Sequence, residues 1–419
     1  MRKNALSAVM SKLNLIIFLF LFIQQSQSKQ VSQYGKSFVL VGGGLSENNT
    51  VIYRQIIDMA GGQNTARIGI IAAASADPLD SFGYYKTVFL NYGAEEVNFI
   101  PVHLANKSAN SDPVVVQLIK QQTGFFFSGG DQARIIESFF DNGHTLSPAM
   151  RAIIEQNNIG VVVAGSSAGT ACQPSAVMVE GGVSYDALRY GAHTSSSHSD
   201  DLVYNQHGGT GLFDGYILDT HFGNRGREGR LIRLLSDTRH LSNGVDYGIG
   251  VDENTALVIT HAGTSTATGH VLGESGVTII DVSKSQTEPQ DGDFNIRDVY
   301  ITFLTRGDEI DLNTHAVKFS SSKTKLGGHE QYDRALTSSD IFYGLRRNEH
   351  KSEFLRVAAS VFDATLDRSS YGVTYETSPR FTVRMSKTGS NCEGWVERHS
   401  SFQTDLHSYK NMYVEITTD

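Results

Sequence analysis

Short apolar runs alternate with longer amphipathic stretches from about residue 36 onward. The runs SFVLVGGG (Ser37–Gly44) and RIGIIAAAS (Arg67–Ser75) predict buried strands, and apolar side chains recur at helical spacing between them, over Asn49–Met59. Three more apolar runs continue the alternation: EEVNFIPV, GFFFSGGD and GVVVAGSS. Near-continuous apolar strands separated by helical segments are typical of a mostly parallel central sheet with helices on both faces. The pattern therefore predicts an α/β fold.

The pattern changes further along the chain. YILDTHF (Tyr216–Phe222) and GIGVDENTALVI (Gly248–Ile259) predict two more strands, and GHVLGESGVTIIDVS and DVYITFLTRGDEIDL predict antiparallel strands that close the core. Beyond residue 316, alternating stretches such as YGVTYE, RFTVRMS and MYVEITT predict a β-rich C-terminal extension. We therefore expect a main domain over residues 35–315 and an extension over residues 316–419.

The N-terminus has the pattern of a cleavable secretory signal. Arg2, Lys3 and Lys12 precede the apolar run Leu13–Ile23, and small serines follow it, so we assign the signal to residues 1–28. The run is short for a transmembrane helix, which needs about 20 apolar residues. A retained N-terminal anchor is the alternative. We expect export to the periplasm or the medium, without stable membrane association.

Charge and cysteine content exclude several classes of function. A formal net charge of −9 argues against a nucleic-acid binder, which would normally carry a basic face. Two cysteines, Cys172 and Cys392, do not make a disulfide framework; one long-range bridge and a buried free thiol at Cys172 both stay open. CxxC and HExxH patterns and His/Cys clusters at zinc-ligand spacing are absent, so we predict no metal and no cofactor.

The strongest local signal is VVVAGSSAGTA, in which Gly165, Ser167 and Gly169 form G-x-S-x-G. The motif follows an apolar strand and precedes a helix-compatible stretch, as a nucleophile elbow requires. The amide of Ala168 would then face the negative charge that develops on a substrate carbonyl oxygen. The alternative is an ordinary glycine-rich turn. We predict that Ser167 is a nucleophile.

A serine nucleophile needs a base that is held in place by a third group. Most of the 14 histidines lie in polar stretches, but His221 ends the predicted strand YILDTHF and would emerge at the same sheet edge as Ser167. By the same reasoning the acid is Glu253 or its neighbour Asp252. Alternation along a strand places only one of the two carboxylates on the side of His221, and the residues alone leave that choice open.

A second glycine turn, in FFFSGGDQARII, joins strand to helix at the same edge. Gly129 and Gly130 allow the backbone to approach a ligand closely, so we expect the second oxyanion donor to be an amide there, at Gly130. Asp131 and Gln132 are placed to contact substrate. The alternative for Asp131 is that it caps the following helix.

Three arginines, Arg225, Arg227 and Arg230, lie within six positions directly after His221. Guanidinium groups so close together repel one another unless they bind carboxylates, which they do through paired hydrogen bonds. A solvated basic helix face is the alternative. Beside the predicted base, the arginines are better explained as an anchor for substrate carboxylates, with some of them paired to a protein acid such as Asp219.

Four ordered motifs resemble those of the cyanophycinase family, relatives of the aspartyl dipeptidase peptidase E: S-G-G-D-Q, G-S-S-A-G-T, D-T-H-F-x-x-R-x-R-x-x-R-L and G-x-G-V-D-E-x-T-A. The resemblance covers residues 35–315. It implies a peptidase E-like fold of the class I glutamine amidotransferase type. It also implies a serine-type exopeptidase that degrades cyanophycin, a poly-aspartate with arginine on each β-carboxylate, to β-Asp-Arg dipeptides. Dimerisation is expected from the resemblance alone.

The resemblance also assigns roles to individual residues. It places the triad on Ser167, His221 and Glu253, which favours Glu253 over Asp252 by analogy. It places the substrate contacts on Gln132, Asp219, Arg225, Arg227 and Arg230. One departure is Thr220, which stands where the intracellular enzymes carry glutamine and so removes a hydrogen-bonding group from the substrate pocket. The signal and the extension also depart from those enzymes, and both suit a degrader of polymer released by other cells.

Other functions compete with this interpretation. The nearest is a secreted aspartyl or isoaspartyl dipeptidase, which the same triad and arginines would serve. A catalytically silent binding protein is another, although an intact Ser, His and Glu set argues against it. A lipase-like esterase fits less well, because such enzymes usually place the acid before the histidine in the chain.

Overall fold

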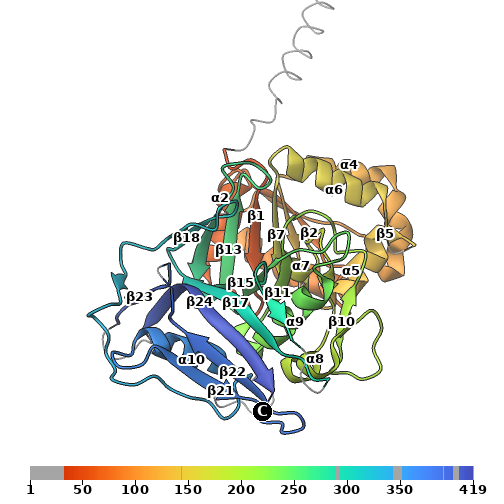
Figure 1. Cartoon of the computed structure of the whole chain (residues 1–419). Coiled ribbons are helices and arrows are strands. Elements are labelled where there is room, and N and C mark those ends of the chain that lie inside the picture. The colour runs from red at the N-terminus through yellow and green to blue at the C-terminus, as the bar shows by residue number, and fades with distance from the viewer. Residues whose placement is uncertain are drawn as a thin grey trace, which may run out of the picture. The chain divides into compact units, whose positions relative to one another are not determined.

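The computed structural model describes residues 33–142, 144–288, 292–342, 352–389, 391–399 and 405–418. The predicted signal, residues 1–28, lies outside these ranges. From Tyr34 onward the chain forms one compact unit (Figure 1). Within the described ranges, no helix has both the length and the apolar character needed to cross a membrane.

The first of two large sheets has nine strands, and its core is parallel. In the spatial order given below, the last five strands run parallel to one another and the first four are antiparallel strands that continue the sheet beside them. This confirms the predicted α/β class with a mostly parallel core. In spatial order the strands are β19 (Val317–Lys318), β18 (Glu309–Asp311), β14 (Thr268–Gly273), β13 (Thr255–Thr260), β1 (Phe38–Val41), β7 (Val162–Ser166), β4 (Gly124–Phe127), β2 (Arg67–Ile71) and β3 (Glu96–Phe99).

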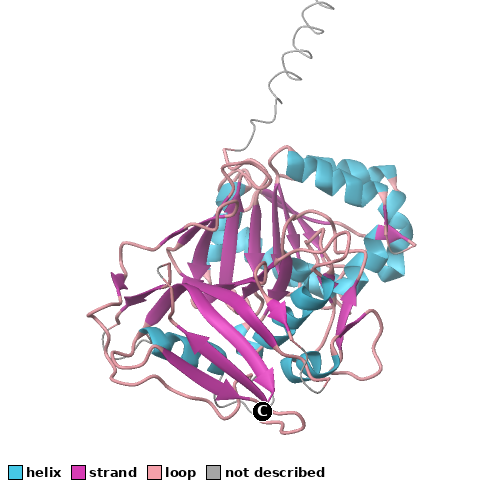
Figure 2. Cartoon of the chain, in the orientation of Figure 1, coloured by secondary structure: helices cyan, strands magenta, loops and turns pink. Residues whose placement is uncertain are grey.

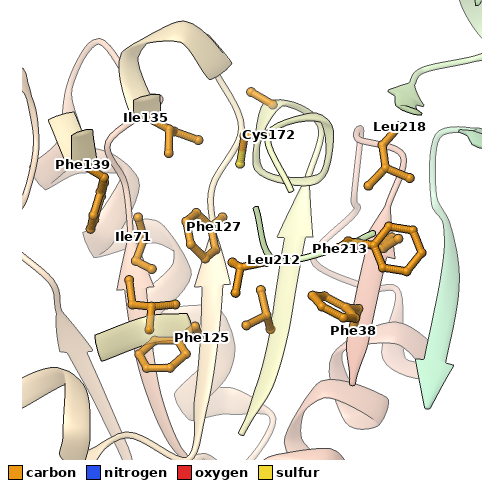
Figure 3. Close-up of a cluster of buried hydrophobic side chains, with 14 of the residues drawn as sticks. Phe38, Ile71, Phe125, Phe127, Ile135, Phe139, Cys172, Leu212, Phe213 and Leu218 are labelled. Carbon is orange, nitrogen blue, oxygen red and sulfur yellow. The ribbon is translucent and has the colours of Figure 1, made fainter. Parts of the chain in front are cut away.

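Helices cover both faces of this sheet, because its buried strands are apolar on both sides. Phe125 and Phe127 of β4 pack in the cluster on one face, shown in Figure 3, while Phe126 packs in the cluster on the other. The first face is covered by α4 (Pro113–Gln121), α5 (Gln132–Phe139), α6 (Pro148–Asn158) and the short α7 (Ala168–Ala171). The second face is covered by α2 (Thr50–Met59) and α3 (Pro78–Asn91).

Polar caps fix where several of these helices begin. A side-chain oxygen accepts a backbone N–H of the first turn in each case, at Asn49, Asp77, Asp112, Asp131 and Ser147. Such caps satisfy amides that have no acceptor within the helix.

The second large sheet has ten strands and is mostly antiparallel; the strands of the last hundred residues belong to it (Figure 2). Its main path is β11 (Ile217–Thr220), β12 (Tyr247–Val251), β15 (Gly276–Asp281), β17 (Ile296–Thr305), β24 (Leu406–Thr418), β22 (Phe381–Ser386) and β21 (Ser369–Val373). Beside this path lie β16 (Gln286–Thr287), β20 (Thr324–Lys325) and β23 (Glu393–Glu397).

Smaller elements complete the described chain. Two short sheets contain β8 (Met178–Val179), β10 (Leu202–Asn205) and β9 (Ala192–His193), and β5 (Phe140–Asp141) with β6 (Thr145–Leu146). The remaining helices are η1 (Leu104–Ser111), α8 (Ser184–Tyr190), η2 (Gly223–Arg225), α9 (Glu228–Thr238) and α10 (Glu353–Phe362).

The expectation of one strand over Gly248–Ile259 is wrong. The structure divides this stretch into β12 and β13, which belong to different sheets. Between them the chain turns through Asn254, whose φ is 52°. The stretch is apolar throughout because both halves are buried, so its hydrophobic pattern does not mark the change of sheet. The turn places Glu253 at a junction between the sheets.

The C-terminal region is β-rich, as predicted, and it also contains α10, which was not predicted. The apolar side chains of Leu231, Phe354 and Tyr409 lie in a single buried cluster, so this region shares a core with the preceding chain. A fully buried ion pair joins Lys323 to Asp308, with 2.6 Å between Nζ and Oδ1. The expected boundary at residue 316 falls between β18 and β19, which pair with each other.

The cysteines are both free thiols in this structure. Cys172 is fully buried at the C-terminal end of α7, and burial raises the pKa of its thiol. Burial also raises the pKa of Cys392 to about 11. Both thiols are therefore held in the uncharged, weakly nucleophilic form.

Candidate active site

The backbone at Ser167 forms a sharp turn between β7 and α7. Ser167 has φ 56° and ψ −119°, a conformation that residues with a side chain rarely adopt. The flanking glycines are required by close backbone approaches. A Cβ on Gly165 would lie 2.1 Å from the carbonyl oxygen of Gly169, and one on Gly169 would lie 2.1 Å from that of Phe127. The turn thus has the geometry expected of a nucleophile elbow.

Three side chains from separate parts of the chain form a hydrogen-bonded line. Ser167 Oγ lies 2.7 Å from Nε2 of His221, and Nδ1 of His221 lies 2.7 Å from Oε1 of Glu253. In this arrangement a neutral imidazole with its proton on Nδ1 can accept the serine proton at Nε2. The carboxylate of Glu253 orients the ring and stabilises the imidazolium that then forms.

The neighbouring carboxylate of Asp252 faces away from His221. It is fully buried and accepts hydrogen bonds from Ser275 Oγ at 2.6 Å and from the amide of Gly223 at 2.8 Å. Glu253 and Asp252 diverge because they lie in the turn between two strands. Glu253 is thus the partner of His221, whereas Asp252 holds the backbone of the loop that follows His221 by accepting the amide of Gly223.

His221 and Ser167 were expected at the edge of one sheet, and this expectation is wrong. Ser167 follows β7 of the nine-stranded sheet, whereas His221 follows β11, the edge strand of the ten-stranded sheet. The two meet because α7 packs against β11. The hydrophobic pattern of the sequence cannot reveal that β7 and β11 belong to different sheets, because both strands are buried and apolar.

A glycine turn that sequence reasoning left without a role supports the histidine. The amide of His221 donates to the carbonyl oxygen of Gly42 at 2.7 Å. A Cβ on Gly43 would lie 2.3 Å from Cε1 of His221, and one on Gly44 would lie 3.3 Å from the Glu253 side chain. The run of three glycines directly after a buried strand was the feature of the sequence that indicated a close backbone approach at this turn. Only glycine lets the backbone approach the catalytic ring this closely.

The environment of His221 favours its neutral form. Burial is the main cause that lowers the pKa of His221 below 6.5; the hydrogen bond to Glu253 raises the pKa, and the charges of Arg225 and Arg227 lower it further. The net shift is downward. A general base must be unprotonated at the working pH, so this shift suits the proposed chemistry.

Ser167 opens onto a cavity of about 290 Å³. Gly130 and Ala168, the predicted oxyanion donors, both line it. Ala168 is the first residue of α7, so its amide has no acceptor within the helix. Gly130 has a φ of 141°, and a Cβ there would lie 2.2 Å from the carbonyl oxygen of Ala74. Both backbone segments therefore approach the serine without side chains in the way.

Asp131 and Gln132 line the same cavity, but their side chains already have partners. The carboxylate of Asp131 caps α5 by accepting from the amide of Ala133 at 2.9 Å, as in the alternative considered for it. The amide of Gln132 donates to the carbonyl oxygen of Val179 at 2.7 Å. One oxygen of each side chain remains for a further contact.

Residues 223–230, which we call the arginine loop, place Arg225, Arg227 and Arg230 in the wall of the cavity. Arg230 binds Asp219 with two hydrogen bonds, of 2.8 Å from Nε and 2.6 Å from Nη2. Arg227 donates to Asp219 at 3.3 Å and to the carbonyl oxygen of Thr220 at 2.7 Å. Asp219 is fully buried, so its carboxylate holds the arginines in place, and a contact with substrate would pass through them.

Arg225 differs from its two neighbours. Its Nε is buried without a hydrogen-bond partner among the described residues. Burial lowers the pKa of Arg225, and burial together with the charge of Arg230 lowers the pKa of Arg227 to about 9. Burial alone would raise the pKa of Asp219, but Arg230 and Arg227 hold it below its ordinary value. Positive charge thus exceeds negative charge in this part of the cavity, which favours binding of an anion.

Two acids near the site were not singled out from the sequence. Glu180 lines the cavity, and burial, followed by the nearby charge of Asp131, raises the pKa of its carboxyl. Glu228 is completely buried, and neither of its carboxyl oxygens has a partner within the described part of the chain. Burial raises the pKa of Glu228 well above 4.5, and the charge of Asp252 raises it further. Glu180 lies outside the motifs, and Glu228 occupies an unspecified position of D-T-H-F-x-x-R-x-R-x-x-R-L, so no sequence signal marked either acid.

The fold and the triad are those of a serine hydrolase. Residues 38–267 match the family described as Peptidase family S51. Cyanophycinases from Nostoc sp. and Synechococcus elongatus are each 29% identical, over 301 and 303 residues; the matches cover 70% of this chain and 91% and 84% of those proteins. A peptidase from an acI-B1 Actinobacterium is similar in structure at a TM-score of 0.46 and 21% identity, over 68% of this chain and 99% of that one.

The chain belongs to peptidase family S51, and it is a serine-type peptidase.

Replacing Arg225 with Met should move the acid limb of the pH profile of kcat/KM to higher pH. Arg225 disfavours the imidazolium, so its loss raises the pKa of His221, and the neutral base is then lost sooner as the pH falls. Arg225→Lys keeps the charge and is the matched control, whose limb should stay near that of the wild type. Initial rates across the acidic and neutral range give the profiles. Identical limbs for Met and Lys would contradict the assignment.

Replacing Glu228 with Gln should stabilise the protein at neutral pH. Because the pKa of Glu228 is raised in the folded state, the folded protein keeps a proton that the unfolded chain releases above 4.5. Stability then falls with rising pH by about 1.4 kcal/mol per unit until the folded pKa is reached. Gln cannot ionise, so the free energy of unfolding of the variant should not fall with rising pH in this way.

Urea unfolding from acidic to neutral pH measures the difference. Exposed Glu155→Gln controls for the removal of one carboxyl from the surface. Equal pH dependence of wild type and Glu228→Gln would mean that Glu228 is ionised in the folded protein.

Proposed function

We propose that this peptidase is an exported cyanophycinase that releases β-Asp-Arg dipeptides through an acyl-enzyme. One observation carries the proposal: the Ser167–His221–Glu253 line opens onto a cavity that also holds Arg225 and Arg227. A nucleophile beside guanidinium groups that have unused hydrogen-bond donors suits a substrate that carries free carboxylates near the bond that is cut. The relatives described as cyanophycinases support the same substrate.

The chemistry would run in two stages. His221 takes the proton of Ser167 as Oγ attacks the carbonyl carbon of an aspartyl residue, and the amides at Gly130 and Ala168 face the resulting oxyanion. The tetrahedral intermediate collapses when the imidazolium protonates the leaving amine. Water then attacks the carbonyl carbon of the acyl-enzyme while His221 takes a proton from it. His221 passes this proton to Ser167 Oγ when the acid product leaves.

The arginine loop gives a reason for selectivity towards aspartyl substrates. In cyanophycin both carboxyl groups of a chain aspartate are in amide bonds, so the free carboxylates nearest the bond that is cut are those of the linked arginine and of the C-terminal residue. A guanidinium beside the nucleophile can bind one of them. Arg225 has the least satisfied guanidinium of the three. An ordinary neutral peptide would bury Arg225 without a partner, which is costly.

The substrate arginine needs an acidic contact, and Glu180 in the wall of the cavity is our candidate for it. Glu180 accepts no side-chain hydrogen bond within the described ranges, and its raised pKa reflects burial and the nearby Asp131. A guanidinium beside Glu180 would relieve both effects. This feature favours a substrate that carries arginine over a short aspartyl peptide without a cation.

The predicted export signal and the C-terminal extension both suit an enzyme whose polymer substrate lies outside the cell that produces the enzyme. The basic residues and apolar run at the N-terminus support a signal that is removed near residue 28. An enzyme released into the medium can reach insoluble granules that are too large to enter a cell.

The proposal is tested with protein secreted into the culture medium, whose mass shows whether residues 1–28 have been removed. Wild type and Ser167→Ala are incubated with insoluble cyanophycin, and soluble products are identified by mass spectrometry. We expect β-Asp-Arg from the wild type and a loss of at least about 10³-fold in the variant, as for removal of a catalytic serine. Cleavage of isoaspartyl dipeptides without attack on the polymer would support the dipeptidase function instead.

Replacing Glu180 with Gln should impair substrates that carry arginine. For a soluble β-Asp-Arg oligomer we expect KM to rise by about tenfold, the usual cost of removing one charged partner. The KM for a matched oligomer with neutral side chains should stay within about twofold. Steady-state kinetics on both oligomers decides. An equal rise for the two would place the substrate arginine elsewhere.

A further inference from the structure

Glycines occupy every third position of the arginine loop, and each of them faces a close neighbour. A Cβ on Gly223 would lie 2.7 Å from Cδ1 of Leu355. One on Gly226 would lie 2.3 Å from the carbonyl oxygen of Phe342, and one on Gly229 would lie 2.9 Å from Cζ of the same phenylalanine. Both neighbours, Leu355 and Phe342, come from the C-terminal region. The loop backbone therefore rests directly on that region.

The surface that the loop rests on is well supported. Leu355 lies in the first turn of α10, and this helix packs against β21, β22, β23 and β24. The helix buries Phe354 and Val357 completely, and Phe342 packs partly buried against the same apolar cluster. The C-terminal strands continue the sheet of β11, which carries Asp219 and Thr220. The strands that support α10 and the strand that carries Asp219 and Thr220 therefore belong to one sheet.

The arginine loop needs such support because its own charges repel one another. Arg225, Arg227 and Arg230 lie within six positions. Asp219 accepts hydrogen bonds from Arg227 and Arg230, whereas Nε of Arg225 has no partner among the described residues. Burial and mutual repulsion lower the pKa of Arg227, which shows the cost of holding these cations together. The backbone of the loop is a short η2 turn followed by left-handed Gly226, with φ 56°. The amides of Arg225 and Arg227 donate to the carbonyl oxygen of Phe222, and the amide of Gly223 donates to Asp252. The contacts with the C-terminal region add to these hydrogen bonds in fixing the turn.

We propose that the C-terminal region positions the substrate-binding arginines, with Leu355 and Phe342 as positioning residues. They press on the glycine side of the loop and so keep Arg225 and Arg227 directed into the cavity beside Ser167. The proposal rests on the proposed function, since it assumes that these arginines bind a carboxylate of the substrate. It gives the extension a role in substrate affinity, separate from the chemistry of the triad.

The test measures binding without catalysis, by calorimetric titration of N-acetyl-L-aspartate into Ser167→Ala protein. Adding Leu355→Ala to this protein should raise the Kd by about tenfold or more, because a displaced guanidinium loses charged hydrogen bonds. Phe342→Ala tests the second contact independently and should act in the same direction. Leu355→Met refills the space and should restore the Kd to within about twofold of the parent.

Val361→Ala is the matched control, because Val361 is buried on α10 a turn and a half beyond Leu355. It should destabilise the protein to a similar degree and leave the Kd unchanged. In proteins that keep Ser167, labelling by an uncharged fluorophosphonate reports the triad alone and should be unaffected by Leu355→Ala.

An unchanged Kd in both the Leu355 and Phe342 variants, or an equal rise in the Val361 variant, would overturn the proposal. Absence of any N-acetyl-L-aspartate binding to the parent would do so as well. If the wild type cleaved neither cyanophycin nor aspartyl peptides while the Kd still followed Leu355, the proposed function would fail and the positioning role would stand.

Discussion

The imidazole of His221 links the two large sheets, and the geometry of the site depends on that link. Its Nε2 lies 2.7 Å from Ser167, which follows a strand of the nine-stranded sheet, and its Nδ1 lies 2.7 Å from Glu253, in the turn where the chain passes between sheets. The backbone at His221 has a φ of 49°, and Gly42 accepts its amide. A change in how the sheets pack would alter both catalytic hydrogen bonds together, so the shared core around them has to be rigid.

Charge is the second constraint on this site. Asp219 is buried and satisfied by Arg230 and Arg227, so it sets the direction of the arginines and leaves positive charge for an anionic ligand. Glu228 of the arginine loop lowers the stability of the protein, because it is buried without a partner among the described residues and the charge of Asp252 further opposes its ionisation. Such unpaired groups are expensive, and proteins tend to retain them where a functional site requires the arrangement. Arg225 and Arg227 lower the pKa of His221, so substrate binding by these arginines and the strength of the base are coupled.

The C-terminal region shows why a boundary drawn from the sequence can mislead about function. Its strands alternate in the manner of an independent β-rich module, and that pattern alone gives no hint of the neighbours they pair with. In the structure β24 pairs with β17, and Leu355 of α10 meets Gly223 directly after the catalytic histidine. The glycine spacing in G-N-R-G-R-E-G-R was visible from the start. Its cause became clear only when the residues that face each glycine were known.

The sequence by itself determined the local chemistry: the apolar strands, the elbow at Ser167, and the cluster of arginines after His221 follow from spacing and residue type, which are properties of neighbours along the chain. Family resemblance, rather than physics, favoured Glu253 over Asp252. Only the tertiary structure decided which strands share a sheet, which carboxylate reaches the imidazole, and which arginine stays unsatisfied. These depend on contacts between residues far apart in the chain, and apolar runs buried in either sheet have the same pattern. Glu180 was missed for the same reason, because no local motif accompanies a side chain that only the fold brings into the cavity.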